Sequence, residues 1–115
     1  MSLSNKSVLL KANASVTEGD NEGFLLWCTE DIKWEFVGDK TLTGKEAVRE
    51  YMKSTYLEPP NFNVENLIEG GEFVTAIGEI SMKDESGKTI DYAYCDVWRF
   101  RDGKMAELKA FVIKT

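Results

Sequence analysis

Five alternate residues near the C-terminus combine four aromatic rings with one carboxyl group. They are Tyr92, Tyr94, Asp96, Trp98 and Phe100. In a β-strand every second side chain points to the same side of the sheet, so this segment places an acid among rings on one face. A carboxyl group in apolar surroundings is costly to ionise and its pKa rises, so it can stay protonated and donate a hydrogen bond to a substrate. The alternative is a structural role, in which Asp96 accepts hydrogen bonds from backbone amides at a strand bend.

Glu35 is the second candidate acid. It lies between Trp34 and Phe36 in a segment with the bulky residues of a strand. If these two aromatic side chains pack outward on the sheet, Glu35 and Val37 face the helices. Two carboxyl groups, one ionised as a base and one protonated as a donor, can move a proton without histidine. The alternative for Glu35 is a solvated surface position.

Other aromatic residues are candidates for the lining of a ligand pocket. They are Trp27, Tyr51 and Tyr56, with Tyr94 and Trp98 from the strand. Aromatic residues at helical spacing also occur in an ordinary core, so this pattern alone does not separate a pocket from a core.

The composition limits the available chemistry. The chain has no histidine, two cysteines and a net charge of −6. Acid–base steps must therefore use carboxyl, tyrosine or lysine side chains, and we expect neither a metal nor a cofactor. The acidic charge argues against nucleic acid or an anionic membrane as partner, and the apolar runs are too short to span a bilayer. Cys28 and Cys95 form no disulfide framework and no signal peptide is evident, so a cytoplasmic location is expected.

The elements that must position these residues are ordered as helices first and strands second. Three helices are expected: Leu3–Val16, a short helix from Asp20 or Asn21 through Cys28, and a helix that Pro59-Pro60 ends. Thr43 and Glu46 fit a capping box at the start of the third helix. Ile32–Val37 is predicted to be a strand between the second and third helices.

The second half is predicted to be an antiparallel meander. Its strands are Phe62–Ile68, Phe73–Lys83, Thr89–Arg101 and Met105–Lys114, separated by segments with hairpin turn chemistry. This order predicts one α+β domain over residues 1–115, in which a curved antiparallel sheet and the helices enclose a cone-shaped cavity. Ala93, Cys95 and Val97 make the outer face more apolar than solvent requires, which favours a homodimer through that face.

This order of elements, with Trp34-Glu35-Phe36-Val37-Gly38 and the segment Thr43–Tyr51, resembles the nuclear transport factor 2-like fold, a cystatin-like cone. Within that fold the chain resembles the SnoaL-like polyketide cyclases and the ketosteroid isomerases. The resemblance implies that Glu35 is a catalytic base and that Asp96 is a protonated oxyanion-hole acid. The tyrosine that completes the oxyanion hole in ketosteroid isomerases is replaced by Ala12, and one such donor is worth roughly 3–4 kcal/mol.

The sequence therefore predicts a pocket protein for a small apolar ligand. In this hypothesis Glu35 removes a proton next to a carbonyl group and Asp96 donates to the enolate, in an isomerisation or aldol-type cyclisation. Two other functions stay open: a non-catalytic binding module for a small hydrophobic ligand, and a structural dimerisation domain whose cone its own side chains fill. Epoxide opening by water, which relatives of the fold perform with an arginine and paired aspartates, is a further alternative, although Arg99 has the opposite parity to Asp96.

Overall fold

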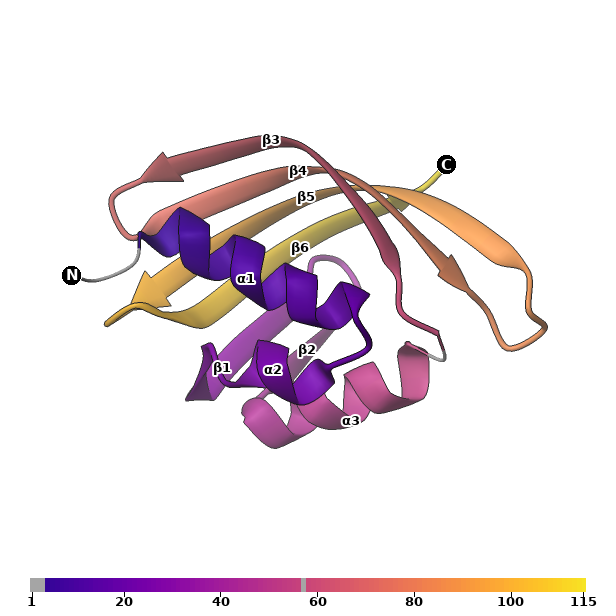
Figure 1. Ribbon diagram of the computed structural model, residues 1–115, viewed down its shortest axis with the longest axis horizontal. Coiled ribbons are helices and arrows are strands. Elements are labelled where there is room, and N and C mark those ends of the chain that lie inside the picture. The colour runs from indigo at the N-terminus through magenta and orange to yellow at the C-terminus, as the bar shows by residue number, and fades with distance from the viewer. Residues whose placement is uncertain (1–3, 57) are drawn as a thin grey trace.

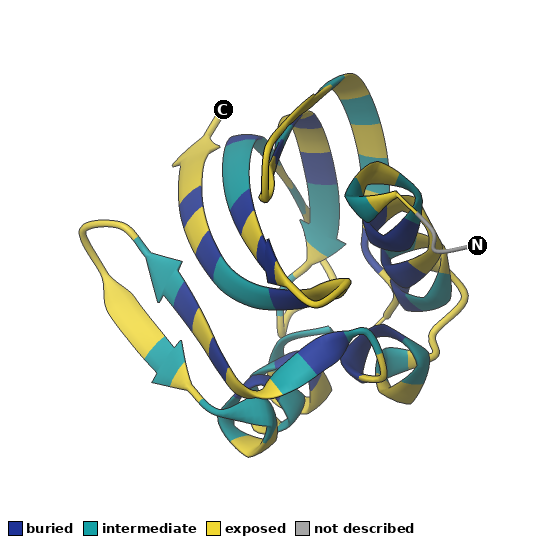
Figure 2. Ribbon diagram, turned by 90° about the vertical axis from the view of Figure 1, so that its left-hand side faces the viewer, coloured by how far each residue is buried: buried dark blue, intermediate teal, exposed yellow. Residues whose placement is uncertain are grey.

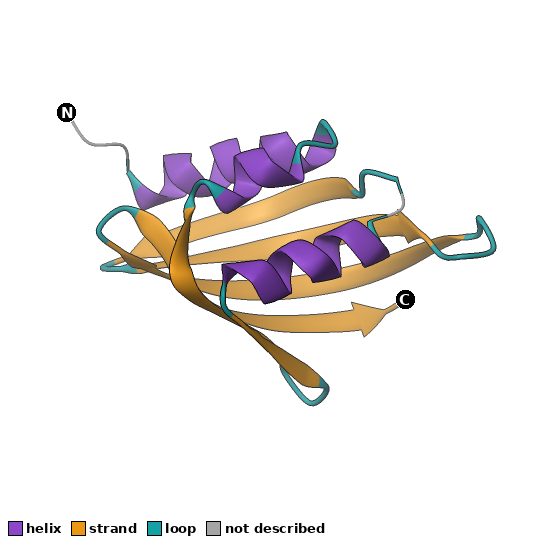
Figure 3. Ribbon diagram, turned by 90° about the horizontal axis from the view of Figure 1, so that it is seen from below, coloured by secondary structure: helices purple, strands orange, loops and turns teal. Residues whose placement is uncertain are grey.

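A computed structural model describes residues 4–56 and 58–115. Its elements in chain order are α1 (Asn5–Thr17), α2 (Asn21–Leu25), β1 (Cys28–Phe36), β2 (Lys40–Thr43), α3 (Lys45–Thr55), β3 (Asn61–Gly70), β4 (Phe73–Lys83), β5 (Thr89–Arg101) and β6 (Lys104–Lys114). The strands form one curved sheet in the order β2-β1-β6-β5-β4-β3. The helices lie within its curve (Figures 1 and 3), which confirms the predicted α+β cone with three helices in the described N-terminal half.

The first two helices begin at polar caps. The side chain of Ser4 accepts a hydrogen bond from the amide of Ser7, and Asp20 does the same for Gly23. The predicted start of the first helix at Leu3 lies outside the described residues. The short helix α2 ends at Leu25 and not at Cys28 as expected, because Cys28 already pairs with β6 as the first residue of β1. None of the helices described is long and apolar enough to cross a membrane.

The third helix is present, but the capping box predicted for it is wrong. Thr43 is the last residue of β2, where it pairs with Lys33, so its side chain does not cap the helix. The N-cap is Gly44, whose φ of 91° is a conformation that glycine adopts without strain. Glu46 pairs with Arg49 one turn along α3 and not with the cap residue.

The predicted meander is confirmed, and β4 and β5 have the predicted bounds. Two features of the other half of the sheet were not predicted. The four-residue strand β2 forms a hairpin with β1, and β1 pairs in parallel with β6, so the sheet is not wholly antiparallel. The parallel register sets Trp34 beside the buried Leu108, and this pairing decides which face of β1 turns inward.

A glycine and a bulge shape the sheet beside Tyr94. Gly78 on β4 pairs with Tyr94 on β5 and with Val64 on β3. A Cβ atom at Gly78 would lie 2.2 Å from the carbonyl oxygen of Asn63, so only glycine fits this close approach. The register of β3 and β4 shifts between Val64 and Asn66, which marks a β-bulge. Because bulges bend the strand that holds them, this point increases the curvature around the inner face.

Burial alternates along the long strands, as Figure 2 shows. The inner face carries the core residues, among them Val74 and Ala76 on β4, Trp98 on β5 and Leu108 on β6. The helices cover this face with their own apolar side chains, so the inner face and the helices form one core cluster.

We expect Gly78→Ala to lower the free energy of unfolding by about 1–3 kcal/mol, because the added methyl group forces β3 away from β4. Urea denaturation measures the change. Gly70→Ala is the matched control, since no atom lies within 4 Å of a Cβ built there. If Gly78→Ala and Gly70→Ala lowered the free energy of unfolding equally, the close approach at Gly78 would not be what shapes the sheet there.

The outer face of the sheet exposes several large apolar side chains: Ile68 on β3, Phe73 and Ile77 on β4, and Phe111 and Ile113 on β6. The same face carries both signs of charge, with Glu35 beside Lys109 and Arg99 beside Glu107. A face that combines apolar side chains with both charges can pair with itself about a two-fold axis. We propose that a second copy of the chain covers it.

Sedimentation at micromolar concentration tests this pairing. We expect the native chain to sediment as a dimer and Phe111→Lys as a monomer, because the lysine would be desolvated in the interface. Leu26→Lys, at an apolar residue exposed on the helical side, should leave the dimer intact. A monomeric native chain would refute the pairing.

Candidate functional site

Asp96 lies on the inner face of β5 between side chains that offer it no polar partner. Its neighbours across the sheet are Ala76 on β4 and Ala110 on β6, and Tyr94 and Trp98 flank it along the strand. Its oxygen Oδ1 is buried without a hydrogen-bond partner among the described residues. Burial raises the pKa of Asp96 to about 7, so its acid and carboxylate forms are both populated at neutral pH.

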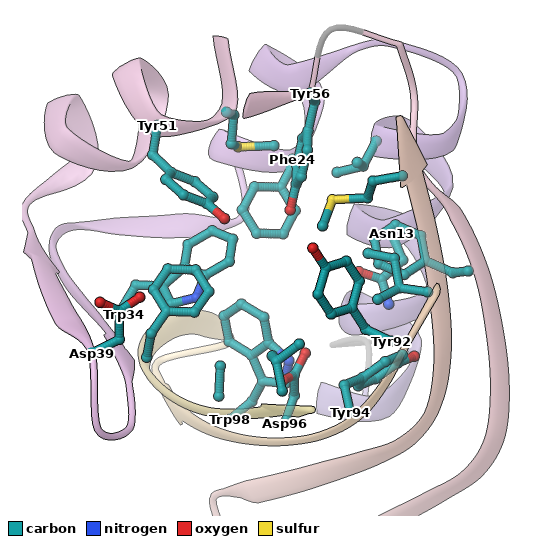
Figure 4. A pocket seen from close by; sticks show the side chains of 18 of the residues that line it. Asn13, Phe24, Trp34, Asp39, Tyr51, Tyr56, Tyr92, Tyr94, Asp96 and Trp98 are labelled. Carbon is teal, nitrogen blue, oxygen red and sulfur yellow. The ribbon is translucent and has the colours of Figure 1, made fainter. Parts of the chain in front are cut away.

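A cavity of about 320 Å³ opens in front of this carboxyl group, as Figure 4 shows. The inner face of the sheet forms its floor, and α1, α2 and α3 contribute Val16, Phe24 and Met52 to its walls. Nine of its described lining residues are aromatic: Phe24, Trp34, Phe36, Tyr51, Tyr56, Phe62, Tyr92, Tyr94 and Trp98. Such a cavity suits a small ring compound, since pockets for small molecules are mainly apolar with a few polar groups.

The aromatic rings on one side of the cavity pack against one another. The indole ring of Trp34 stacks on Phe36 with 5.6 Å between ring centroids and lies 5.7 Å from Tyr51 and 6.1 Å from Trp98. These contacts join β1, α3 and β5, so the walls of the cavity come from elements far apart in the sequence. Aromatic pairs at such distances stabilise beyond their buried area and hold each other's orientation.

Hydroxyl groups also reach the cavity. In Figure 4 the hydroxyl groups of Tyr51, Tyr56 and Tyr92 point into it. Burial raises the pKa of Tyr51 and of Tyr56, so both stay protonated and can donate hydrogen bonds. Burial also raises the pKa of Tyr94 to about 12, and its hydroxyl and the indole Nε1 of Trp34 are buried without a partner among the described residues.

The expected orientation of Glu35 on the first strand is wrong, although Val37, which follows the end of β1, does line the cavity. Trp34 and Phe36 face the cavity, and Glu35 therefore lies on the outer face, half-buried beside Lys109 of β6. The reason is the parallel pairing of β1 with β6, which places Trp34 next to the buried Leu108. Glu35 is not in the lining, so it is not positioned to remove a proton from a molecule in this cavity.

The other predicted lining residues divide into two groups. Tyr51, Tyr56, Tyr94 and Trp98 line the cavity with Asp96. Trp27 does not: it packs against the core outside the cavity, where its carbonyl oxygen accepts a hydrogen bond from the amide of Met105. The expectation for Trp27 is therefore wrong, because α2 ends before it and the chain turns there into β1.

Two polar lining residues were not identified from the sequence. Ala12, at the position expected for a tyrosine, is buried in the core of α1, and the next residue, Asn13, lines the cavity instead. Asp39 reaches the exposed rim from the turn between β1 and β2. The sequence around Asn13 and Asp39 does not mark either residue as part of a pocket, because an asparagine on a helix and an aspartate in a turn are both common.

Metal ligands do not gather at this site in the described ranges. No three His, Cys, Asp or Glu side chains of residues 4–56 and 58–115 come together in a group that could hold a metal ion. Asp96 stands alone inside the cavity, and Asp39 is the other carboxylate in the described lining. The arrangement can bind an uncharged molecule and exchange a proton with it through one carboxyl group.

Comparisons with known proteins identify the fold and the family. The family model described as a SnoaL-like domain matches residues 10–108. SalBIII, an epoxide hydrolase/cyclase-like enzyme of pyran ring formation in the polyether salinomycin, is similar with a TM-score of 0.86 and 23% identity over 94% of this chain and 89% of that chain. TerC, co-crystallised with polyporic acid, is similar with a TM-score of 0.80 and 22% identity over 93% and 89% of the two chains.

A nuclear transport factor 2-like protein of unknown function from Cytophaga hutchinsonii is similar as well, with a TM-score of 0.76 and 19% identity over 96% of this chain and 100% of that chain. At these identities the three structures show the fold alone, which is the predicted nuclear transport factor 2-like cone. No curated protein matches the sequence.

The raised pKa of Asp96 predicts a pH dependence of stability. The folded chain keeps a proton on Asp96 up to a pH near 7, whereas the unfolded chain releases it near the ordinary value of 3.8. The free energy of unfolding should therefore fall as pH rises from about 4 to about 7 and then level off. Each pKa unit is worth about 1.4 kcal/mol, which gives at most about 4 kcal/mol.

Asp96→Asn should lack this slope, so the variant should gain stability relative to the native chain as pH rises across that range. Urea denaturation at several pH values measures the difference. Asp91→Asn removes an exposed carboxylate from the same strand and should keep the native slope. A slope that persists unchanged in Asp96→Asn would show that Asp96 is not the group responsible.

Proposed function

The chain belongs to the SnoaL-like domain family, and we propose that it binds a small, uncharged carbonyl compound in its aromatic cavity and moves a proton on that compound with Asp96. One observation carries this proposal: Asp96 is a carboxyl group inside an apolar cavity, where Oδ1 is buried without a hydrogen-bond partner in the described part of the chain and burial raises the pKa to about 7. A general acid or base works best when its pKa lies near the working pH, because both forms are then available.

The reaction needs a single carboxyl group that alternates between its carboxylate form and its protonated form. As a carboxylate, Asp96 takes a proton from the carbon next to the carbonyl, and the electrons of the broken C–H bond form an enolate. Asp96, now protonated, can return the proton to another carbon of the same molecule, which is an isomerisation. If the enolate carbon instead attacks a second carbonyl of the molecule, the new alkoxide takes the proton from Asp96, which is an aldol-type cyclisation. Neither route consumes a co-reactant.

The tyrosine hydroxyls supply the hydrogen bonds that an enolate oxygen needs. Tyr51, Tyr56 and Tyr92 point into the cavity, and the pKa of the first two is raised, so they donate at neutral pH. In this proposal they replace the oxyanion-hole tyrosine of the ketosteroid isomerases, at whose position this chain has Ala12. A positioned donor to a developing oxyanion is commonly worth about 3–4 kcal/mol of the barrier.

The similar structures support a cyclase-like pocket protein and fix neither its mechanism nor its substrate. SalBIII is a cyclase-like enzyme and TerC was crystallised with an organic ligand, on the same fold. Because one fold carries many activities, the proposed reaction of this chain rests on its own cavity and on Asp96.

A binding module without catalysis is the second candidate. The observation in its favour is that the enclosed part of the described cavity holds one carboxyl group, since Asp39 lies at the exposed rim. Such a protein would hold the same uncharged ligand through the rings and donors, and would leave it unchanged.

Hydrogen–deuterium exchange distinguishes the proposed proton-transfer enzyme from the binding module. In D₂O, NMR follows the loss of the proton next to the carbonyl in a panel of neutral, apolar aromatic ketones. We expect the native chain to accelerate exchange in at least one of them and Asp96→Asn to lose that acceleration by roughly 10²–10⁴-fold. Glu35→Gln should exchange as fast as the native chain, because Glu35 lies on the outer face.

Acceleration that survives in Asp96→Asn would remove Asp96 from the reaction. Saturable binding of the panel without any acceleration in the native chain would favour the binding module.

A further inference from the structure

Asp96 brings a carboxyl group into a cavity whose described lining holds no positively charged side chain. Neither lysine nor arginine belongs to that lining, and the neighbours of Asp96 across the strands are Ala76 and Ala110. The whole chain has a net charge of −6. The carboxylate form of Asp96 therefore has no counter-ion in the described lining, and a charge in an apolar site is unfavourable without one.

One oxygen of this carboxyl group is open to the cavity. Oδ1 is enclosed by the protein, whereas Oδ2 is not among the enclosed atoms of the described residues. Because Asp96 belongs to the lining, Oδ2 is the atom that a ligand can contact. Figure 4 shows the side chain at the base of the cavity between Trp98 and Tyr94. An ammonium group at this place would donate a charge-assisted hydrogen bond to Oδ2.

The aromatic rings around Asp96 also attract positive charge. Tyr94 and Trp98 lie two residues to either side of it, roughly 7 Å along the strand. The face of an aromatic ring attracts a cation that lies within about 6 Å of the ring centroid. One ring of the lining already does so, since Nζ of the exposed Lys40 lies 5.1 Å from the ring centroid of Tyr51. A carboxylate and aromatic rings together are the groups that suit an organic cation.

The other titratable groups of the described lining do not neutralise Asp96. They are Tyr51, Tyr56, Tyr92, Tyr94 and Asp39. Burial raises the pKa of Tyr51, Tyr56 and Tyr94, so these hydroxyl groups stay uncharged at neutral pH. Asp39 at the exposed rim is a second acid. The elements α1, α2, β1, β3, β4 and β6 contribute side chains without a titratable group to the described lining.

We propose that the cavity binds a second class of ligand, a protonated aromatic amine, whose ammonium group pairs with the carboxylate of Asp96 and whose ring packs among the aromatic side chains. Such an amine occupies the space of the carbonyl substrate and engages the acid that the reaction uses, so it acts as a competitive inhibitor. The inference goes beyond the proposed function: it concerns the same cavity but requires no proton transfer to or from carbon.

The fold favours this pairing because it has already removed the carboxyl group from water. An ion pair in an apolar site often gains little, since both ions lose their hydration. Asp96 loses its hydration when the chain folds and not when a ligand binds, and this burial is the reason that its pKa is raised. Binding therefore desolvates the amine alone. A cation beside Asp96 also stabilises the carboxylate, so amine binding and proton release from Asp96 are linked.

Two probes with the same carbon skeleton test the site: 4-phenylbutan-2-amine, a cation between about pH 5 and pH 8, and the neutral ketone 4-phenylbutan-2-one. Calorimetry measures both affinities across this range. We expect the affinity of the native chain for the amine to rise about 100-fold, because the ionised fraction of Asp96 rises by that factor when its pKa is about 7. The ketone should bind no more tightly at the higher pH, because the protonated acid is its hydrogen-bond donor.

Asp96→Asn should remove the rise with pH. At the upper end of the range it should bind the amine roughly 10–100-fold more weakly than the native chain, the value of a hydrogen bond to a charged group. It should still bind the ketone, which shows that its cavity is intact. Asp91→Asn removes an exposed carboxylate from the same strand and should bind the amine as the native chain does.

A second measurement on the native chain does not depend on the folding of a variant. Carbon NMR follows the titration of the Asp96 carboxyl group with and without a saturating concentration of each probe. By linkage, the amine should move the midpoint to lower pH, because it binds the carboxylate form. The ketone should not lower the midpoint.

Four outcomes would overturn the amine site. They are an amine affinity that does not rise with pH, amine binding by Asp96→Asn that equals native binding at the upper end of the range, an Asp96 midpoint that saturating amine does not lower, and no saturable binding of the amine. Deuterium exchange in the ketones tests the proposed function separately. Amine binding without exchange would retain this inference and contradict the reaction, and exchange without amine binding would do the reverse.

Discussion

The isolation of one carboxyl group within the sheet is the constraint on which the rest of this structure depends. Asp96 is flanked across the strands by Ala76 and Ala110, which have no polar atom to offer and occupy little space. Neither side chain can pair with the acid, and its burial raises the pKa of Asp96 to about 7. Ala110 also lines the cavity, so its small side chain leaves space beside Asp96. A hydrogen-bond donor at either position would lower the pKa of Asp96.

The fold supplies the enclosure that this isolation requires. A flat sheet would leave Asp96 in water, but the close approach at Gly78 and the bulge in β3 bend the long strands around their inner face. The helices then close the remaining side with Val16, Phe24 and Met52. Members of this fold differ widely in function because this cone accepts many side chains at the same backbone positions. In this chain those positions hold aromatic rings, hydrogen-bond donors and one acid.

Much of this arrangement can be predicted from the sequence, for reasons that differ between elements. The parity of β5 identifies Asp96, Tyr94 and Trp98 as one face, because alternation in a strand is local. Alternation does not say which face turns inward, and for β1 that depends on its parallel pairing with β6, a contact between distant segments. Glu35 was therefore placed on the wrong side. The strand β2 is short and mostly exposed, so it carries no clear periodic signal. The packing of four rings around Trp34 joins α2, β1, α3 and β5, so no local sequence pattern predicts it.

The account depends on the state of Asp96, and the most direct test is its own titration. Carbon NMR of the carboxyl group over a range of pH, with Asp96→Asn to identify the resonance, gives the pKa without any knowledge of the ligand. The account predicts a midpoint near 7, since burial raises the pKa of Asp96 and its Oδ1 has no hydrogen-bond partner among the described residues. A midpoint at or below the ordinary value of 3.8 would mean that Asp96 is ionised and paired in the folded chain, and would contradict the proposed reaction.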